Sequence, residues 1–123
     1  MNEHRAELNN YRQSPRKVRL VANLLKGKSV FEAKSKIAFI IKRSALPLKK
    51  LLNSAIANGK NLGAKEENLW IKSVKVDSGK ILYRRRMASR GRVSPIHKRT
   101  SHVSIILVEK PSNEAKKSKK VSK

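Results

Sequence analysis

The sequence predicts an α+β fold, in which a helical first part is followed by one long β-hairpin. Up to about residue 62, apolar side chains recur at helical spacing. After Gly63 the pattern changes to two runs rich in Val and Ile, residues 69–77 and 100–108. Because these runs have similar lengths and flank a centre near residues 89–91, we interpret them as the two arms of a single hairpin.

The composition predicts a single small domain with an anionic partner. A chain of 123 residues is just long enough to bury a modest core. It has 31 Lys and Arg against 8 acidic residues, a formal net charge of +23, which destabilises a compact state unless something neutralises it. Cysteine is absent, which excludes disulfides and thiolate metal sites.

The first two helices have recognisable starts. Ser14 and Pro15 fit an N-cap followed by proline at the first helical position, and Gly27 ends this helix. Ser29 and Glu32 have the spacing of a capping box that opens a second helix. The buried stripes are expected to hold Val18, Val21, Ala22 and Leu25 in the first helix, and Val30, Ala33, Ile37, Ile40 and Ile41 in the second.

A third helix is predicted to end near residues 58–59, and its apolar face comprises Leu48, Leu51, Leu52, Ala55 and Ile56. Pro47 allows two interpretations: it lies in the first turn, with Ser44 as N-cap, or it kinks a longer helix. The large aromatic residues Phe31, Phe39 and Trp70 are expected in the core.

The hairpin is apolar only near its base, where Val103, Ile105 and Leu107 share one face. Residues 80–102 contain eight Lys or Arg and no acidic residue. Arms of roughly 18 residues would reach about 60 Å. An isolated two-stranded ribbon is marginal in water, so the outer part is either disordered alone or held by a partner.

We divide the chain into one domain, residues 1–109, and a Lys-rich tail, residues 110–123. The domain has a globular body, residues 1–77 and 101–109, and an extended hairpin, residues 78–100. The tail has too little apolar surface to offset the entropy cost of ordering and is expected to be disordered. No apolar run approaches the ~20 residues that span a bilayer, and no secretory segment is apparent, so we expect a cytoplasmic protein.

Catalysis and metal binding are poorly supported. None of the acidic residues pairs with a histidine or a second carboxylate at active-site spacing. Three histidines without cysteine form no metal-ligand pattern, and the glycines form no phosphate-binding loop. We therefore expect no enzymatic activity, no catalytic residue, no metal and no cofactor.

Polyanion binding has two supports. Arg16, Lys17 and Arg19 crowd the start of the first helix, where the helix dipole disfavours cations and where a phosphate would find free amides. A solvated basic face would explain that cluster equally well. Residues 78–102 contain six Arg and two Lys, whereas elsewhere Lys outnumbers Arg 18 to 5. Arginine binds phosphate bidentately, so this bias favours shaped contacts with nucleic acid.

Three partners remain open from the residues alone. A folded RNA with deep crevices would accept a projecting basic ribbon better than a smooth duplex. The first alternative is a DNA architectural protein that uses the ribbon in a groove. The second is a membrane-surface protein, which the lack of an interfacial Trp/Phe face disfavours. Tyr83 within the ribbon is equally explained as a base-stacking residue and as an exposed strand tyrosine.

Three strings resemble those of a known family: YRQSPRKVRLVANLLKGK, KKLLNSAIANGKN, and RGR followed by IHKRTSHV. They resemble the bacterial large-subunit ribosomal proteins of the L-twenty-two family, in that family's order, over about residues 8–108. The resemblance implies three helices packed on a small antiparallel sheet, with one long protruding β-hairpin. It also implies a structural constituent of the large ribosomal subunit that binds 23S-type rRNA, supports subunit assembly and lines the nascent-peptide exit tunnel.

The resemblance also implies roles for particular residues. The rRNA-binding residues would be Arg12, Ser14, Arg16, Lys17, Arg19, Lys80, Arg84, Arg85, Arg86, Arg90, Arg92, His97, Lys98 and Arg99. The tip facing the tunnel would be Met87, Ala88, Ser89, Arg90 and Gly91. The implied partners are 23S rRNA, neighbouring large-subunit proteins and the nascent peptide, with no membrane and no second copy of the chain. The implied location is the large ribosomal subunit of a bacterium or of an organelle that encodes the protein.

The sequence departs from the family pattern at the tip and in the second arm of the hairpin. Met87 and Ala88 stand where the family often has Pro-Arg, and Pro95 stands where a basic residue is common.

Overall fold

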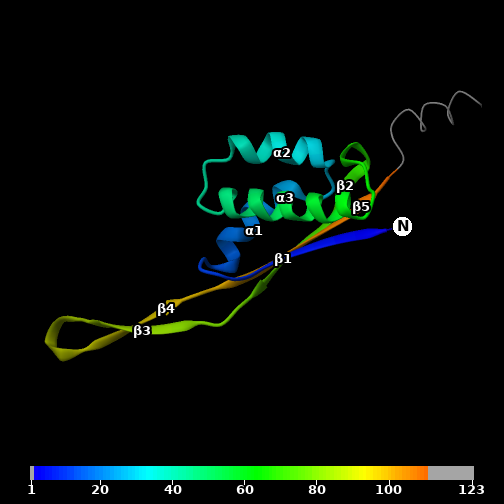
Figure 1. The fold of residues 1–123 in the computed structure, drawn as a ribbon. Coiled ribbons are helices and arrows are strands. Elements are labelled where there is room, and N and C mark those ends of the chain that lie inside the picture. The colour runs from blue at the N-terminus through cyan, green and yellow to red at the C-terminus, as the bar shows by residue number, and fades with distance from the viewer. Residues whose placement is uncertain (1, 111–123) are drawn as a thin grey trace, which may run out of the picture.

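The computed structural model describes residues 2–110 and confirms the predicted α+β class. In chain order its elements are β1 (Glu3–Tyr11), α1 (Pro15–Leu25), α2 (Val30–Phe39), α3 (Ala45–Asn61), β2 (Leu69–Ser78), β3 (Leu82–Met87), β4 (Val93–Lys98) and β5 (Ser101–Glu109). Single 3₁₀ turns cover Glu66–Asn68 and Ser89–Gly91. The three helices cover one face of a three-stranded sheet, and a two-stranded ribbon projects from one end (Figure 1).

β5 is the central strand of the sheet and pairs antiparallel with β1 on one side and β2 on the other. The predicted inward face of β5 is confirmed, since Val103, Ile105 and Leu107 are buried. β1 was not predicted, because only His4 and Ala6 are buried in it, and the apolar Leu8 and Tyr11 are partly buried among polar residues. Residues 3–11 form a strand because the edge of β5 offers them backbone N–H and carbonyl groups that would otherwise be unpaired.

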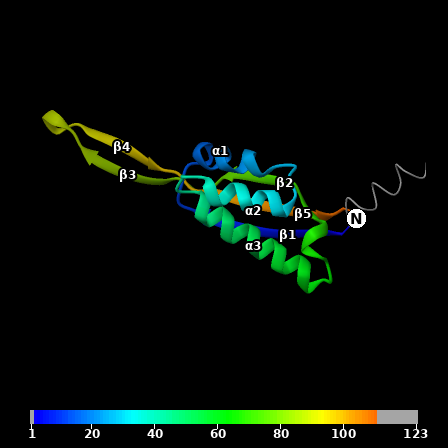
Figure 2. The same cartoon turned by 90° about the horizontal axis from the view of Figure 1, so that it is seen from above.

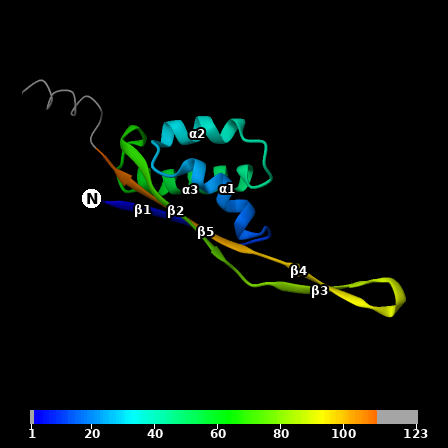
Figure 3. The ribbon, with the colours of Figure 1, turned by 180° about the vertical axis from the view of Figure 1, so that it is seen from behind.

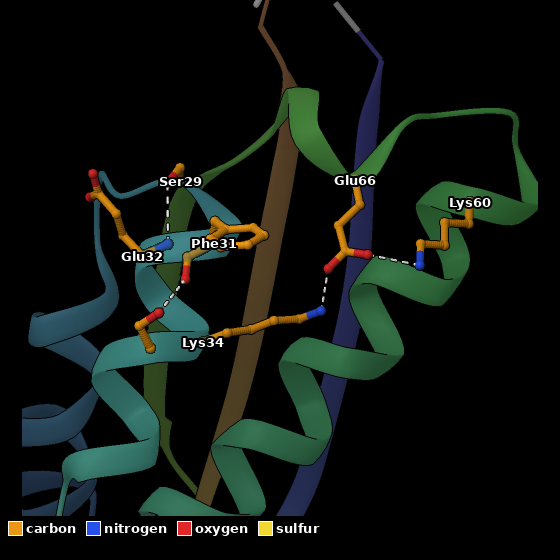
Figure 4. A network of polar contacts seen from close by, with 7 residues as sticks. Ser29, Phe31, Glu32, Lys34, Lys60 and Glu66 are labelled. Atoms are coloured by element: carbon orange, nitrogen blue, oxygen red, sulfur yellow. Dashed lines mark hydrogen bonds and ion pairs between the residues drawn. The ribbon is translucent and has the colours of Figure 1, made fainter.

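The predicted helix starts are confirmed. Ser14 is the N-cap of α1 and Pro15 its first residue. Ser29 is the N-cap of α2, and its hydroxyl oxygen accepts a hydrogen bond from the Glu32 backbone N–H at 3.3 Å (Figure 4). Pro47 lies in the first turn of α3, which is the first of the two interpretations.

The buried stripe predicted for the second helix is wrong at its last residue, and the third helix ends slightly later than predicted. α2 ends at Phe39, so Ile41 lies beyond the helix with 97% of its surface exposed, and Ile40 is only partly buried. α3 runs past Gly59 to Asn61. A side chain at Gly59 would begin 3.3 Å from the ring of His4 on β1, so this glycine permits a close approach of strand to helix.

The core lies between the helices and the sheet. Its largest fully buried side chains include Leu25, Leu48, Leu52, Leu69, Ile71, Ile105 and Leu107, and each contributes about 1.5–3 kcal/mol by leaving water. The prediction that Phe31 and Phe39 are core residues is wrong, because they are 75% and 85% exposed, outside the buried stripe of α2. Trp70 is only partly buried, and the Lys110 ammonium lies 4.9 Å from its ring centroid.

The hairpin extends from the end of the body opposite to the N-terminus (Figures 1 and 2). Its ladder is not continuous, because the β2–β5 pairing ends at Ser78 and Ser101 and the β3–β4 pairing begins at Leu82 and Lys98. Between these two pairs the first arm advances four residues and the second three, so the first arm holds one extra residue. We call residues 79–81 and 99–100, which join the two ladders, the neck.

No helix among residues 2–110 is long and apolar enough to cross a membrane. The predicted Lys-rich tail lies outside the described residues, except for Lys110.

Candidate nucleic-acid interface

The neck is a specific hydrogen-bonded joint. The Gly79 N–H donates to the Thr100 carbonyl oxygen at 2.9 Å, and the Thr100 hydroxyl donates to the Lys80 carbonyl oxygen at 2.6 Å. A Cβ atom at Gly79 would lie 2.4 Å from the Thr100 hydroxyl oxygen. The joint therefore requires glycine at position 79, and it holds the predicted rRNA-binding residue Lys80.

The start of β5, directly after the neck, is hydrogen bonded to the end of β1 and to the turn between β1 and α1. The Ser101 hydroxyl donates to the Gln13 carbonyl oxygen, and the Tyr11 hydroxyl donates to Gln13 Oε1 at 2.8 Å. The Asn10 N–H donates to Nδ1 of His102 at 3.1 Å. These bonds place Arg12, which lies between Tyr11 and Gln13, beside the base of the hairpin.

A basic cleft of about 360 Å³ lies where the hairpin leaves the body, and we call it the neck cleft. Its lining residues are Arg12, Arg43, Leu82, Lys98, Arg99 and Thr100. The structure thus brings together Arg12, Lys98 and Arg99, all predicted rRNA-binding residues, from separate parts of the chain. Arg43 was not predicted, because a single arginine in the loop between α2 and α3 belongs to no motif.

Beyond the neck, the ribbon has two different faces. Side chains alternate along a strand, and paired residues share a face. Arg84 and Arg86 of β3 therefore lie on the same face as Lys98 of β4, which pairs with Leu82. Arg85 lies on the opposite face. All of these cations are exposed, although one Arg84 nitrogen donates to the Tyr83 carbonyl oxygen at 2.8 Å.

The face that carries Arg85 also carries the ribbon's aromatic contact. Tyr83 pairs with His97 in the β3–β4 ladder, and their rings meet edge to face, with centroids 5.0 Å apart. Tyr83 is nevertheless 64% exposed. Such a partly covered ring remains free on one side for stacking.

The predicted tip residues lie at the far end of the ribbon. The Ala88 N–H donates to the Arg92 carbonyl oxygen at 2.8 Å and closes the loop, and Ser89–Gly91 form its 3₁₀ turn. Arg90 has φ 60° and Gly91 has φ 72°. The left-handed conformation costs a residue other than glycine roughly 1–2 kcal/mol, so the tip holds its arginine at an energetic cost.

The start of α1 faces the same end of the body as the hairpin (Figure 2). Arg16, Lys17 and Arg19 are exposed there, no acidic residue lies in the first turn, and the Ser14 side chain makes no capping hydrogen bond. Arg19 has a structural contact as well, since its guanidinium donates to the Val76 carbonyl oxygen on β2 at 3.0 Å. The predicted cations therefore fall into three neighbouring groups, on α1, at the neck and along the ribbon.

The ion pairs of the acidic residues include none of these cations. Glu66 pairs with Lys34 and Lys60 (Figure 4), and their hydrogen bonds hold the pKa of its carboxyl below the ordinary value of 4.5. A hydrogen bond from Lys72 likewise lowers the pKa of Glu3. Among residues 2–110, the hairpin cations have no carboxylate partner, and no group of three metal-binding side chains is present.

Comparison with known proteins finds one family model and several relatives that all belong to the same ribosomal protein family. A family model described as ribosomal protein L22p/L17e matches residues 6–108, which include the helices and the whole hairpin. The chain is 48% identical to the large ribosomal subunit protein uL22 of Mesoplasma florum over 106 residues, 85% of this chain and 95% of that protein. It is 45% identical to the uL22 protein of Chlamydia trachomatis serovar L2b over 80% of this chain and 90% of that protein. It is 40% identical to the uL22 protein of Geobacter sulfurreducens over 88% of this chain and 98% of that protein.

Proposed function

This chain belongs to the ribosomal protein L22p/L17e family, and we propose that it binds large-subunit rRNA through its ribbon, its neck and the start of α1. Members of the family are structural, non-enzymatic components of the large ribosomal subunit, and so is this chain. The observation that carries the proposal is the projecting hairpin, in which residues 78–100 hold eight Lys or Arg and no acidic residue.

The physical argument concerns what stabilises the ribbon. β3 and β4 pair only with each other, outside the three-stranded sheet. An isolated ribbon of this kind is marginal in water, and its like charges repel. Phosphates beside the ribbon would neutralise the charge and accept bidentate hydrogen bonds from the arginines. The ordered ribbon is therefore a form suited to lying among rRNA phosphates.

We further propose that the ribbon passes between rRNA helices and that its tip, residues 87–91, lines the nascent-peptide exit tunnel. The support is the shape of the ribbon, which is two strands wide and ends in a tight turn away from the body (Figure 3). A narrow ribbon can reach the interior of a folded RNA, and by bridging several rRNA segments it would support subunit assembly. The proposed partners are 23S rRNA, neighbouring ribosomal proteins and the nascent peptide.

The decisive experiment removes residues 80–99 from the full chain. Gly79 and Thr100, which are already hydrogen bonded, then form a two-residue turn, and β2 and β5 remain intact. Binding to large-subunit rRNA is measured across a salt titration. We expect a large loss of affinity and a shallower salt dependence. The slope of the logarithm of the binding constant against the logarithm of the salt concentration, which we call the log–log slope, should become shallower by up to about seven, near 0.9 for each cation removed.

Circular dichroism controls for folding, since all three helices lie outside the deleted segment. Equal binding by both proteins would mean that the body carries recognition and would contradict the proposed role of the ribbon. Two further comparisons separate the alternatives. A preference for duplex DNA at equal ionic strength would contradict the ribosomal function, as would co-sedimentation with anionic vesicles in the presence of competing RNA.

A further inference from the structure

The neck cleft gathers positive charge from three distant parts of the chain. Arg12 comes from the turn between β1 and α1, and Arg43 from the loop between α2 and α3. Lys98 is the last residue of β4, and Arg99 belongs to the neck. Leu82 and Thr100 complete the lining. At about 360 Å³, the cleft is at the lower end of the range of about 300–1,000 Å³ typical of small-ligand sites.

These cations have no counter-charge within the described part of the chain. No acidic residue lines the cleft, and none of its four cations forms an ion pair with residues 2–110. Like charges gathered in one concavity repel, and low-dielectric walls strengthen the repulsion. The arrangement is therefore unfavourable in the free protein, and an anion would relieve it.

The segments that carry the cations are nonetheless held in place. The Gln13 N–H donates to the Tyr11 carbonyl oxygen at 2.9 Å, and the Gln13 carbonyl oxygen accepts from the Ser101 hydroxyl, so the backbone on both sides of Arg12 is held. Arg43 lies in a turn closed by the Ala45 N–H, which donates to the Lys42 carbonyl oxygen at 3.1 Å. Planar guanidinium groups on fixed backbones lose little freedom when they bind, which favours shaped contacts with a phosphate.

We propose that the neck cleft binds a backbone phosphate of an RNA strand that crosses from the body to the hairpin, with Arg43 as a binding residue beside Arg12, Lys98 and Arg99. This inference rests on the proposed rRNA binding. The hairpin meets the body at the neck, so a phosphate held between Arg43 on the body and Arg99 on the hairpin also sets the direction in which the ribbon projects. Leu82 provides an apolar surface for the adjoining ribose.

The test uses Arg43→Gln in the full chain, with Lys42→Gln as the matched control. Lys42 is the preceding residue, is exposed and carries the same charge, but does not line the cleft. For Arg43→Gln we expect the log–log salt slope of rRNA binding to fall by about one. The ratio of wild-type to variant affinity should then shrink about threefold to fourfold between about 50 and about 200 mM salt. Lys42→Gln should keep the wild-type slope.

Two further measurements separate binding from structure. Arg43→Lys should retain most of the slope but bind less tightly than wild type, since an ammonium lacks the planar fork. The melting temperature of the free Arg43→Gln protein should not fall, because Arg43 has no ion pair among residues 2–110. A lower melting temperature would indicate a structural role and overturn the inference.

The remaining outcomes also discriminate. If the Arg43→Gln variant keeps the slope of the wild type and the wild type has a steep salt dependence, the proposed phosphate binding in the neck cleft is contradicted. The proposed rRNA binding by the protein is not. Equal losses in Arg43→Gln and Lys42→Gln would indicate diffuse attraction by the loop and would also overturn it. A shallow wild-type slope would instead contradict the proposed function itself.

Discussion

Glu66 illustrates how a single acidic residue supports a strongly basic fold. It lies in the 3₁₀ turn before β2 and forms ion pairs with Lys34 of α2 and with Lys60 of α3, the latter at 2.8 Å (Figure 4). The hydrogen bonds from Lys34 and Lys60, in that order, lower the pKa of its carboxyl, although partial burial opposes them. One carboxylate therefore connects two helices to the loop that leads into the sheet.

We expect Glu66→Gln to lower the free energy of unfolding by about 1 kcal/mol, the upper range for partly exposed ion pairs. Urea denaturation measures it, and Glu67→Gln is the control, because it removes the same charge from an exposed residue without an ion pair among residues 2–110.

The difference between wild type and Glu66→Gln should also depend on pH. The pKa of the carboxyl is lower in the folded state than its ordinary value of 4.5. Its contribution is therefore complete above pH 4.5 and is lost as the pH falls through the lowered value. Equal stability of the Glu66→Gln and Glu67→Gln variants at neutral pH would contradict this account of Glu66.

At the scale of elements, the alternation of side chains along β3 divides the three consecutive arginines. Arg84 and Arg86 share a face with Lys98, whereas Arg85 faces the other side with Tyr83 and His97. The sequence alone predicts that replacing all three with Gln lowers the salt slope of rRNA binding by up to about three. The register indicates which of them act together.

We expect the double variant Arg84→Gln, Arg86→Gln to lower that slope by about two, and Arg85→Gln alone to lower it by clearly less than one. The physical reason is that the first face presents three cations, whereas the second is mainly aromatic and apolar. The measurement is a salt titration of rRNA binding, with the helical circular dichroism signal as the folding control. An equal effect per arginine would show that phosphates contact both faces alike.

The molecule as a whole has an uneven distribution of charge. The sheet face that the helices leave open (Figures 1 and 3) carries Glu3, Glu7 and Asp77 together with Arg5, Lys72 and Lys75. With Lys110, whose ammonium lies over Trp70 on the same face, three acidic residues and four cations nearly balance there, in a chain whose net charge is +23. The excess positive charge is therefore on the helices, their loops, the hairpin and the Lys-rich tail, and we expect rRNA to cover the helices and the hairpin and to leave the open sheet face free.

This expectation is tested with Lys75→Gln, which removes an exposed charge from the open face, and Lys17→Gln, which removes one from the start of α1. Lys17→Gln should lower the salt slope of rRNA binding by about one, and Lys75→Gln should leave it unchanged. If both variants lower the slope equally, rRNA contacts the open sheet face as well.

Local pattern predicted much of this protein. Ser14 with Pro15 and Ser29 with Glu32 placed the first two helix starts, and the apolar spacing indicated all three helices, because caps and periodicity depend on neighbours within a few residues. The arginine-rich segment and the net charge indicated a polyanion partner for the same reason, since composition needs no knowledge of the fold. The hairpin itself followed from two strand-like runs around a turn.

Contacts between distant residues decided the rest. β1 is a strand because β5 offers it an edge, and Gly59 lies within α3 because β1 approaches it closely, so neither has a local signal. Arg43 and Arg99 are 56 residues apart in the chain (99 − 43) and line one cleft only because the neck brings the hairpin against the loop between α2 and α3. Local sequence thus specified the charge, the three helices and the hairpin. Tertiary packing determined β1 and which cations converge, because both depend on contacts between residues far apart in the chain.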